Sequence, residues 1–201
     1  TNGFAGCSAA FEATVRNCTI EEGVTIGCDG DQPYIGSIAG RMQGTVENCV
    51  SYATVKGTSY VGGIIGTRDN AMGECNVINC TFGGTVEGNS NVGGIVGGGY
   101  SNQSAPNGGR PTITGCTSTG TVSGNSNVGG ILGGDICVAQ TWSNVAGSIS
   151  NNTFTGKVSG TKNIGAIIGY LCSLNAMDSI FGNLYSIDCG AEGVIGFLKY
   201  L

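Results

Sequence analysis

Histidine is absent from the 201 residues of this chain, and charged residues make up only 10% of them. Without histidine, the chain lacks the imidazole base of Ser-His-Asp and Cys-His nucleophiles and every histidine ligand for a metal. The net charge is −5, and the Lys and Arg residues are scattered singly. Because nucleic-acid binding needs a basic patch or stripe, we expect no nucleic-acid partner.

Long apolar runs are missing as well. No run approaches the roughly 18 residues of a spanning helix, and the apolar tail Gly193–Leu201 is far too short, so we expect no membrane insertion. Proline is scarce, with 3 residues, whereas glycine supplies 39. The glycines do not follow the every-third-residue pattern of collagen, and Val and Ile are abundant, which predicts short strands joined by tight turns.

The chain repeats itself. Thr85–Gly97 reads TVEGNSNVGGIVG, and Thr121–Gly133, 36 residues later, reads TVSGNSNVGGILG. Near-identity at a fixed offset is typical of a repeat architecture. The segment V-G-G-I-x-G, or a close variant of it, occurs at Ile35–Gly40, Val61–Gly66, Val92–Gly97, Val128–Gly133 and Ile164–Gly169.

A second motif, V/I-x-x-C, precedes each of these segments. It begins at Val15, Val46, Val77, Ile113 and Ile149, and its fourth residues are Cys18, Cys49, Cys80, Cys116 and Asn152. The residue before this column is usually asparagine, which predicts a stacked corner at Asn17, Asn48, Asn79 and Asn151. We expect a decayed sixth repeat that begins near Ile187, places Cys189 in the column and ends at Gly196.

Each repeat alternates short apolar strands with turns, and no repeat closes a core alone. Stacking the repeats about 4.8 Å apart would bury the Val, Ile, Phe and Cys columns. We therefore predict an all-β fold, a right-handed parallel β-solenoid (β-helix) of about five to six coils with loop insertions on one side. The chain forms one domain, 1–201: an irregular N-terminal coil (1–17), the repeats (18–169) and a decayed C-terminal coil or cap (170–201).

The segment V-G-G-I-[IVL]-G, preceded by T/K-V-x-G, resembles the GLUG repeat from about Val15 to Gly169. The first copy departs from the pattern at Ser37 and Ala39, and the fifth at Ala166. GLUG repeats occur in large secreted or surface-bound bacterial proteins, including accessory regions of IgA-specific metallopeptidases and haemagglutinin-like adhesins. The resemblance implies an extracellular bacterial β-solenoid module and carries over no catalytic residues.

Ten cysteines favour an oxidising compartment. The cysteine column is open to two interpretations, a buried ladder of thiols or disulfides between neighbouring coils. Among the remaining cysteines, Cys137 and Cys172 follow Gly133 and Gly169 at similar distances, which favours them as a disulfide. Because the chain lacks a C-x-x-C pair, we expect no metal and no cofactor.

Variable segments separate the repeats, and insertions of this kind often carry binding. The candidate binding residues in and beside them are Tyr100, Asn102, Arg110, Gln140, Trp142, Tyr170 and Tyr185. The alternative is that these aromatic side chains only cover the edge of the core.

Threonines also recur in columns, such as Thr81, Thr117 and Thr153, or Thr85 and Thr121. Flat threonine arrays are a route to ice binding, but Val50, Gly83 and Lys157 interrupt these columns. Acidic residues at 21–22 and 29–31 lack a calcium-binding pattern.

We expect a non-enzymatic structural or adhesive module of an extracellular or cell-surface protein. Its partners would be a host or bacterial surface protein or glycan, and it would assemble end to end into a homo-oligomer or filament through exposed strand edges. The alternatives are a polysaccharide-active β-helix enzyme, which needs paired carboxylates, and an ice-binding solenoid.

Overall fold

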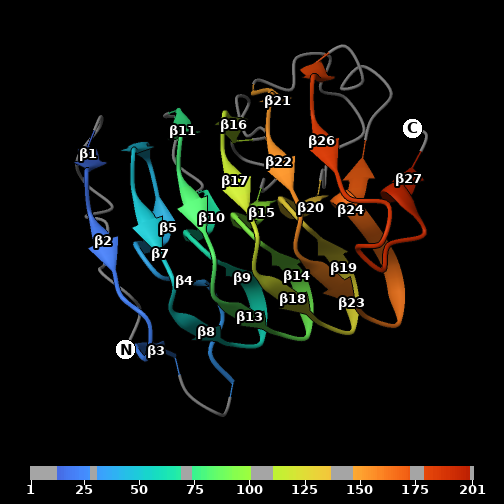
Figure 1. Cartoon of the computed structure of the whole chain (residues 1–201), viewed down its shortest axis with the longest axis horizontal. Helices are drawn as coiled ribbons and strands as arrows, with labels where there is room; N and C mark the ends of the chain where they lie inside the picture. The colour runs from blue at the N-terminus through green and yellow to red at the C-terminus, as the bar shows by residue number, and fades with distance from the viewer. Residues whose placement is uncertain are drawn as a thin grey trace.

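A computed structural model describes residues 13–27, 31–68, 74–100, 111–136, 147–172 and 179–199, and shows a parallel β-solenoid (Figure 1). Coils follow one another along the long axis, from β1 (Ala13–Arg16) to β27 (Gly193–Lys199). The first four coils contain five strands each, the last two strands of the fifth coil merge into β24 (Lys162–Cys172), and the sixth coil contains three strands. The described part of the chain holds no α-helix, and the prediction of an all-β parallel solenoid is confirmed.

Sheets A and B take one strand from each of the six coils, and sheet C takes one from each of the first five. Sheet A contains β1, β6 (Gly44–Glu47), β11 (Cys75–Ile78), β16 (Thr112–Thr114), β21 (Ile149–Ser150) and β25 (Ile180–Phe181). Sheet B contains β2 (Thr19–Ile20), β7 (Val50–Ser51), β12 (Thr81–Phe82), β17 (Thr117–Ser118), β22 (Thr153–Phe154) and β26 (Leu184–Tyr185). Sheet C contains β3 (Thr25–Ile26), β8 (Thr54–Lys56), β13 (Thr85–Glu87), β18 (Thr121–Ser123) and β23 (Lys157–Ser159).

Sheet D contains the last two strands of each of the first four coils, together with β24 and β27, and therefore consists of two rows. The fourth-strand row contains β4 (Ile35–Gly36), β9 (Ser59–Gly62), β14 (Ser90–Gly93) and β19 (Ser126–Gly129). The fifth-strand row contains β5 (Ala39–Met42), β10 (Ile65–Arg68), β15 (Val96–Tyr100) and β20 (Leu132–Ile136). The long strand β24 joins the two rows and pairs with β27 at the end of the sheet.

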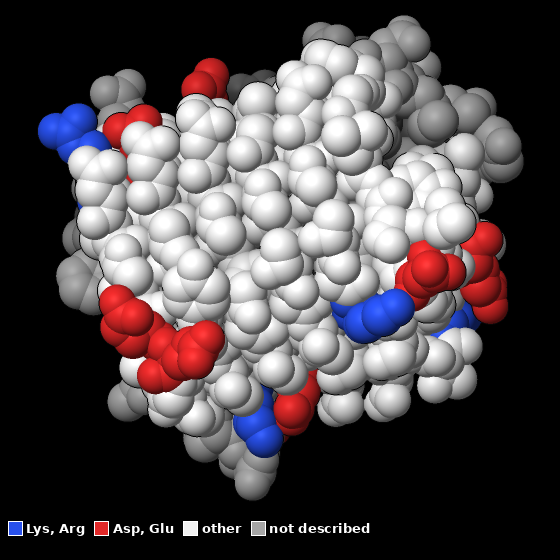
Figure 2. All heavy atoms as spheres, in the orientation of Figure 1, with Lys and Arg blue, Asp and Glu red and all other residues white. Residues whose placement is uncertain are grey.

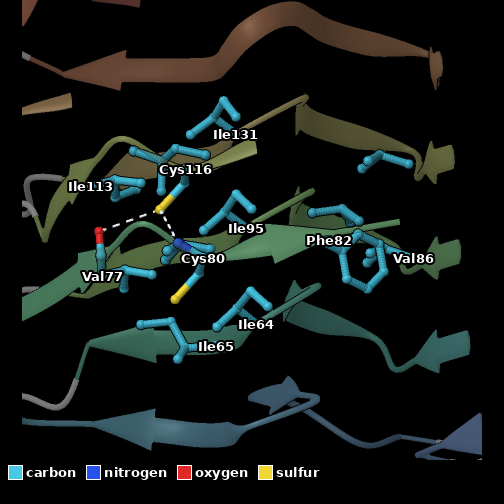
Figure 3. Packing of buried hydrophobic residues seen from close by; sticks show 14 of the residues in the cluster. Ile64, Ile65, Val77, Cys80, Phe82, Val86, Ile95, Ile113, Cys116 and Ile131 are labelled. Atoms are coloured by element: carbon cyan, nitrogen blue, oxygen red, sulfur yellow. Dashed lines mark hydrogen bonds between the residues drawn. The ribbon is translucent and has the colours of Figure 1, made fainter. Parts of the chain in front are cut away.

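Equivalent residues of successive repeats stack in register. In sheet A, Val46 pairs with Val77, Val77 with Ile113, and Ile113 with Ile149. All four are fully buried, and the other inward-facing columns continue the same core (Figure 3). Alternation puts apolar side chains inside and polar ones outside on each short strand, as the sequence pattern predicted.

Two corners of each coil use the left-handed backbone region, where asparagine and glycine are favoured. The corner between sheets A and B has a positive φ at Asn17, Asn48, Asn79, Gly115, Asn151 and Gly182. The corner that opens sheet D has a positive φ at Tyr34, Tyr60, Asn91, Asn127 and Asn163. The predicted asparagine corner is confirmed, and its physical basis is the dihedral angle that the turn requires.

Large and small side chains alternate in the inward column of sheet B, which reads Ser51, Phe82, Ser118 and Phe154. The Phe82 ring reaches Gly63 of the coil before it, where an added Cβ would lie 2.4 Å from ring atom Cγ. Phe154 meets Gly130 in the same way, also at 2.4 Å. In these two coils the second glycine of V-G-G-I-x-G makes room for an aromatic ring of the next coil, whereas Gly94 faces Ser118.

The first and last glycines of the motif lie on the two facing rows of sheet D, and we call the contact between them the glycine seam. The first glycines are Gly36, Gly62, Gly93, Gly129 and Gly165, and the last glycines that face them are Gly66, Gly97, Gly133, Gly169 and Gly196. A Cβ on a first glycine would lie 2.6 to 2.7 Å from the nitrogen of the last glycine one coil on. A Cβ on a last glycine would lie 2.4 to 2.7 Å from a backbone nitrogen of the facing row. Because real Cβ atoms do not approach this closely, the two rows pack backbone against backbone only if both positions are glycine.

The sixth coil begins earlier than the sequence pattern predicted. Ile180 of β25 pairs with Ile149, and Leu184 of β26 pairs with Thr153, so Asn183 occupies the sixth place in the cysteine column. The expectation that Cys189 stands there is wrong: Cys189 is buried beside Val158, whose N–H donates to the Cys189 carbonyl. The pattern V/I-x-x-C does not find the sixth coil because asparagine takes the place of cysteine at this corner.

Candidate binding surfaces

The corner column consists of Cys18, Cys49, Cys80, Cys116, Asn152 and Asn183, and its side chains form a hydrogen-bonded ladder. The N–H of Cys80 donates to Cys116 Sγ at 3.4 Å, and the N–H of Cys116 donates to Asn152 Oδ1 at 2.9 Å. Asn183 Oδ1 accepts from the N–H of Asn152 at 3.0 Å. Cys116, Asn152 and Asn183 thus each accept a hydrogen bond from the corner N–H of the preceding coil.

The same side chains also donate. Cys116 Sγ donates to the Val77 carbonyl at 3.4 Å, as Figure 3 shows, and Asn152 Nδ2 donates to the Ile113 carbonyl at 2.9 Å. Both acceptors are the first residue of V/I-x-x-C one coil earlier. Cysteine and asparagine each combine an acceptor with a donor, which explains why both residue types occupy this column.

The described cysteines are free thiols, namely Cys18, Cys49, Cys75, Cys80, Cys116 and Cys189. Burial raises the pKa of Cys49 to about 11 and that of Cys75 to about 12. The hydrogen bond with Cys80, together with burial, raises the pKa of Cys116. Because the thiolate is the nucleophile and the metal ligand, these buried thiols act as packing and hydrogen-bonding groups. Of the two interpretations of the column, the structure shows the thiol ladder.

Two further ladders lie at the turn G-N-S-N. Asn127 Nδ2 donates to Asn91 Oδ1 at 2.9 Å, and Asn163 Nδ2 donates to Asn127 Oδ1 at 2.7 Å. Asn125 Nδ2 donates to Asn89 Oδ1 at 3.3 Å on the neighbouring exposed position. In the first two coils, tyrosines replace the asparagines: Tyr34 and Tyr60 stack with ring centroids 5.3 Å apart.

The candidate binding residues of the insertions are only partly described. Asn102, Arg110, Gln140, Trp142 and Cys137 lie outside the described residues, and the side chains of Tyr100 and Cys172 are not described either. The predicted pairing of Cys137 with Cys172 therefore stays a prediction. Tyr170 is half-buried and stacks on Phe197 with ring centroids 5.5 Å apart, whereas Tyr185 is exposed on the sixth coil.

The outer sides of sheets B and C form a surface that we call the hydroxyl face. Its residues stand in three columns that run along the axis, and most of them are threonine. The first column is Thr19, Val50, Thr81, Thr117, Thr153 and Leu184. The third column is Thr25, Thr54, Thr85, Thr121 and Lys157, and between the two lie Tyr52, Gly83, Thr119, Thr155 and Ser186.

Charge is confined to the margins of this surface. Figure 2 shows an uncharged central area with acidic and basic side chains around its rim. Lys56 and Glu87, at the outer edge of sheet C, pair across neighbouring coils at 3.1 Å, and Arg16 and Glu47 of sheet A approach to 3.9 Å. Exposed pairs of this kind contribute at most about 1 kcal/mol each. The centre of the hydroxyl face therefore offers hydroxyl groups and no charge.

Two further findings concern metal and membrane. Within the described ranges, no three His, Cys, Asp or Glu side chains gather in a way that could hold a metal ion. The same residues contain no helix that is long and apolar enough to cross a membrane.

Comparison with known families identifies the repeat. A family model, the GLUG motif, matches residues 88–123. The chain therefore contains a GLUG motif at residues 88–123. The match starts at the G-N-S-N turn, crosses β14, the glycine seam and the corner column, and ends with β18, so it covers one full 36-residue period. Comparisons of this GLUG-motif protein with curated proteins and with solved structures gave no match.

Substitutions at Cys116 test the ladder. Cys116→Ala removes the acceptor for the buried N–H of Cys80, and an unsatisfied buried donor costs about 1 to 3 kcal/mol of folding free energy. Cys116→Asn, which imitates Asn152 one coil on, should lower the free energy of unfolding less than Cys116→Ala. Urea denaturation of the two variants gives both values. The reverse order would show that packing volume governs this position instead of hydrogen bonding.

Proposed function

We propose that this GLUG-motif chain is a non-enzymatic structural and adhesive module of an extracellular bacterial surface or secreted protein. The observation that carries the proposal is that the strands repeat closely from coil to coil, whereas the segments between the coils differ in length and sequence. The stacked strands form a rod that presents regular lateral faces, and the variable segments are attached to it at one place.

That place is the connection from the fifth strand of one coil to the first strand of the next. Segments 69–73, 101–110, 137–146 and 173–178 all fall between these two strands, in four successive coils. The connection from β5 to β6, by contrast, is the single residue Gln43. The coils therefore close without the long segments, which supports a role for them outside the fold.

The rod itself is suited to carry binding segments. The first five coils are tied to one another by parallel ladders in all four sheets, and the sixth joins the fifth through sheets A, B and D. Side-chain ladders at the corners add to these ties. Because the first five coils contact one another along the whole circumference, the attachment points keep a fixed spacing. No observation on the described residues favours the alternative of a polysaccharide-active enzyme.

Binding by the variable segments is tested by shortening them. In one variant, residues 101–110 and 137–146 are each replaced by the shorter segment 69–73. We expect the unmodified chain to bind immobilised mucin or members of a glycan array, and the shortened variant to bind about tenfold more weakly or not at all, which is about 1.4 kcal/mol or more. Circular dichroism and the melting temperature, which should stay unchanged, serve as the control for folding. Equal binding by both proteins would exclude these segments as the adhesive surface.

Self-association along the axis belongs to the same proposal. The sixth coil carries most of the large apolar side chains that are exposed on the described chain: Phe181, Leu184, Tyr185, Ile187, Val194 and Phe197. Leu184 is 66% exposed and Ile187 is 87% exposed. Contiguous exposed apolar surface favours protein contacts, and an open sheet edge accepts a further parallel strand.

Sedimentation velocity tests this association. The 201-residue chain should form concentration-dependent oligomers, because a contact between opposite ends of the solenoid is heterologous and propagates. The double variant Tyr185→Lys, Ile187→Lys should stay monomeric, because Tyr185 continues the inward column of sheet B and is exposed at the end of the solenoid. Tyr52→Lys, which places a charge on a lateral face, should assemble normally. A monomer at all concentrations of the unmodified chain, or assembly by the double variant, would contradict the proposed contact.

A further inference from the structure

Tyr52 lies flat on the hydroxyl face because the next coil has a glycine beneath it. A Cβ added to Gly83 would lie 2.7 Å from Tyr52 Cδ1 and 2.8 Å from Cε1, so the ring covers the place where a side chain would stand. Tyr52 is nevertheless 40% exposed. The interruption of the threonine column at Gly83 is therefore the space that the tyrosine ring occupies.

Hydroxyl groups surround this ring. Thr81 and Thr85 stand on either side of Gly83 in the first and third columns, and Thr119 continues the middle column one coil further on. Thr119 Oγ1 is 3.4 Å from the place of the Gly83 Cβ, which puts it close to the ring. We call Tyr52 together with these three threonines the Tyr52 platform. By register, Glu21 of the first coil precedes Tyr52 in the middle column, so the acidic rim begins one coil before the ring.

The chemistry of the platform matches a sugar ring. The C–H groups on one face of a pyranose pack on an aromatic ring, whose face is electron-rich, while the hydroxyl groups at the sugar's rim need hydrogen-bonding partners beside the ring. Threonine hydroxyls both donate and accept, so they serve sugar hydroxyls of either orientation. The platform offers no positive charge to an anionic glycan. Ice binding needs a flat, regular array of hydroxyl groups, and the Tyr52 ring interrupts that array.

We propose that the Tyr52 platform binds a neutral pyranose glycan. This inference rests on the proposed adhesive function and adds a ligand class and a second location, on the repeated rod and apart from the variable segments. The axial repeat of the threonine columns extends the surface on both sides of the ring, so a linear oligosaccharide can continue beyond the first sugar.

Affinity electrophoresis tests the proposal with defined probes. The 201-residue chain is run through gels that contain hydroxyethylcellulose, galactomannan or laminarin, and through a gel that contains the polyanion alginate. We expect retardation by at least one neutral polysaccharide and none by alginate. Tyr52→Ala should weaken the retardation about tenfold or abolish it, and Tyr52→Phe, which keeps the ring, should retain it.

Two further variants keep the test specific. Gly83→Thr restores the threonine column and displaces the ring, so it should lose binding as Tyr52→Ala does. Tyr34→Ala removes a half-buried tyrosine at the corner that opens sheet D and should change nothing. Circular dichroism shows whether each variant is folded. Equal retardation of the unmodified chain and Tyr52→Ala, or no retardation by any neutral polysaccharide, overturns the inference. The proposed adhesive function survives that result if mucin or glycan-array binding still depends on segments 101–110 and 137–146.

Discussion

The fold depends on a contact between two stretches of bare backbone. The two rows of sheet D face each other so closely that neither the first nor the last glycine of V-G-G-I-x-G has room for a Cβ. This constraint repeats in every coil, since Gly62, Gly93 and Gly129 each face a glycine of the coil that follows. The seam sets the shape of one side of the solenoid, and the motif is repeated because each coil must reproduce that shape.

The packing of the core and the conformation of the corners are compatible with the glycine seam. Between its glycines, sheet D contributes buried side chains such as Ile65, Val96 and Leu132 to the core. From sheet B, Phe82 and Phe154 reach across to Gly63 and Gly130. The corners then need left-handed dihedral angles, which asparagine and glycine supply, and side chains that both accept and donate hydrogen bonds. Stability is thus distributed over many equivalent contacts between neighbouring coils, as expected for a solenoid.

Much of this architecture could be predicted from the sequence, because stacking makes equivalent positions chemically alike. The near-identity of Thr85–Gly97 and Thr121–Gly133 predicted the coil, its register and the threonine columns. The sixth coil was placed wrongly because a search for cysteine overlooked Asn183, although Asn152 already showed that asparagine fits this column. The Tyr52 platform was also missed: along the chain Gly83 is only a gap, and contact with a ring from the previous coil exists only in three dimensions.

The glycine seam is tested most directly by comparing one substitution at two equivalent positions. Gly129 and Gly193 both occupy the first-glycine column, since Gly129 pairs with Gly165 and Gly165 with Gly193. A Cβ on Gly129 would overlap the Leu132 carbonyl oxygen of the facing row and lie 2.7 Å from the Gly169 nitrogen. The nearest atom to a Cβ on Gly193 is the Ile195 carbonyl oxygen, 3.6 Å away. Urea denaturation should show that Gly129→Ala lowers the free energy of unfolding by about 3 kcal/mol, near the upper end for overpacking, and that Gly193→Ala changes it by less than about 0.5 kcal/mol. Equal effects of the two substitutions would contradict the seam as the contact on which the fold depends.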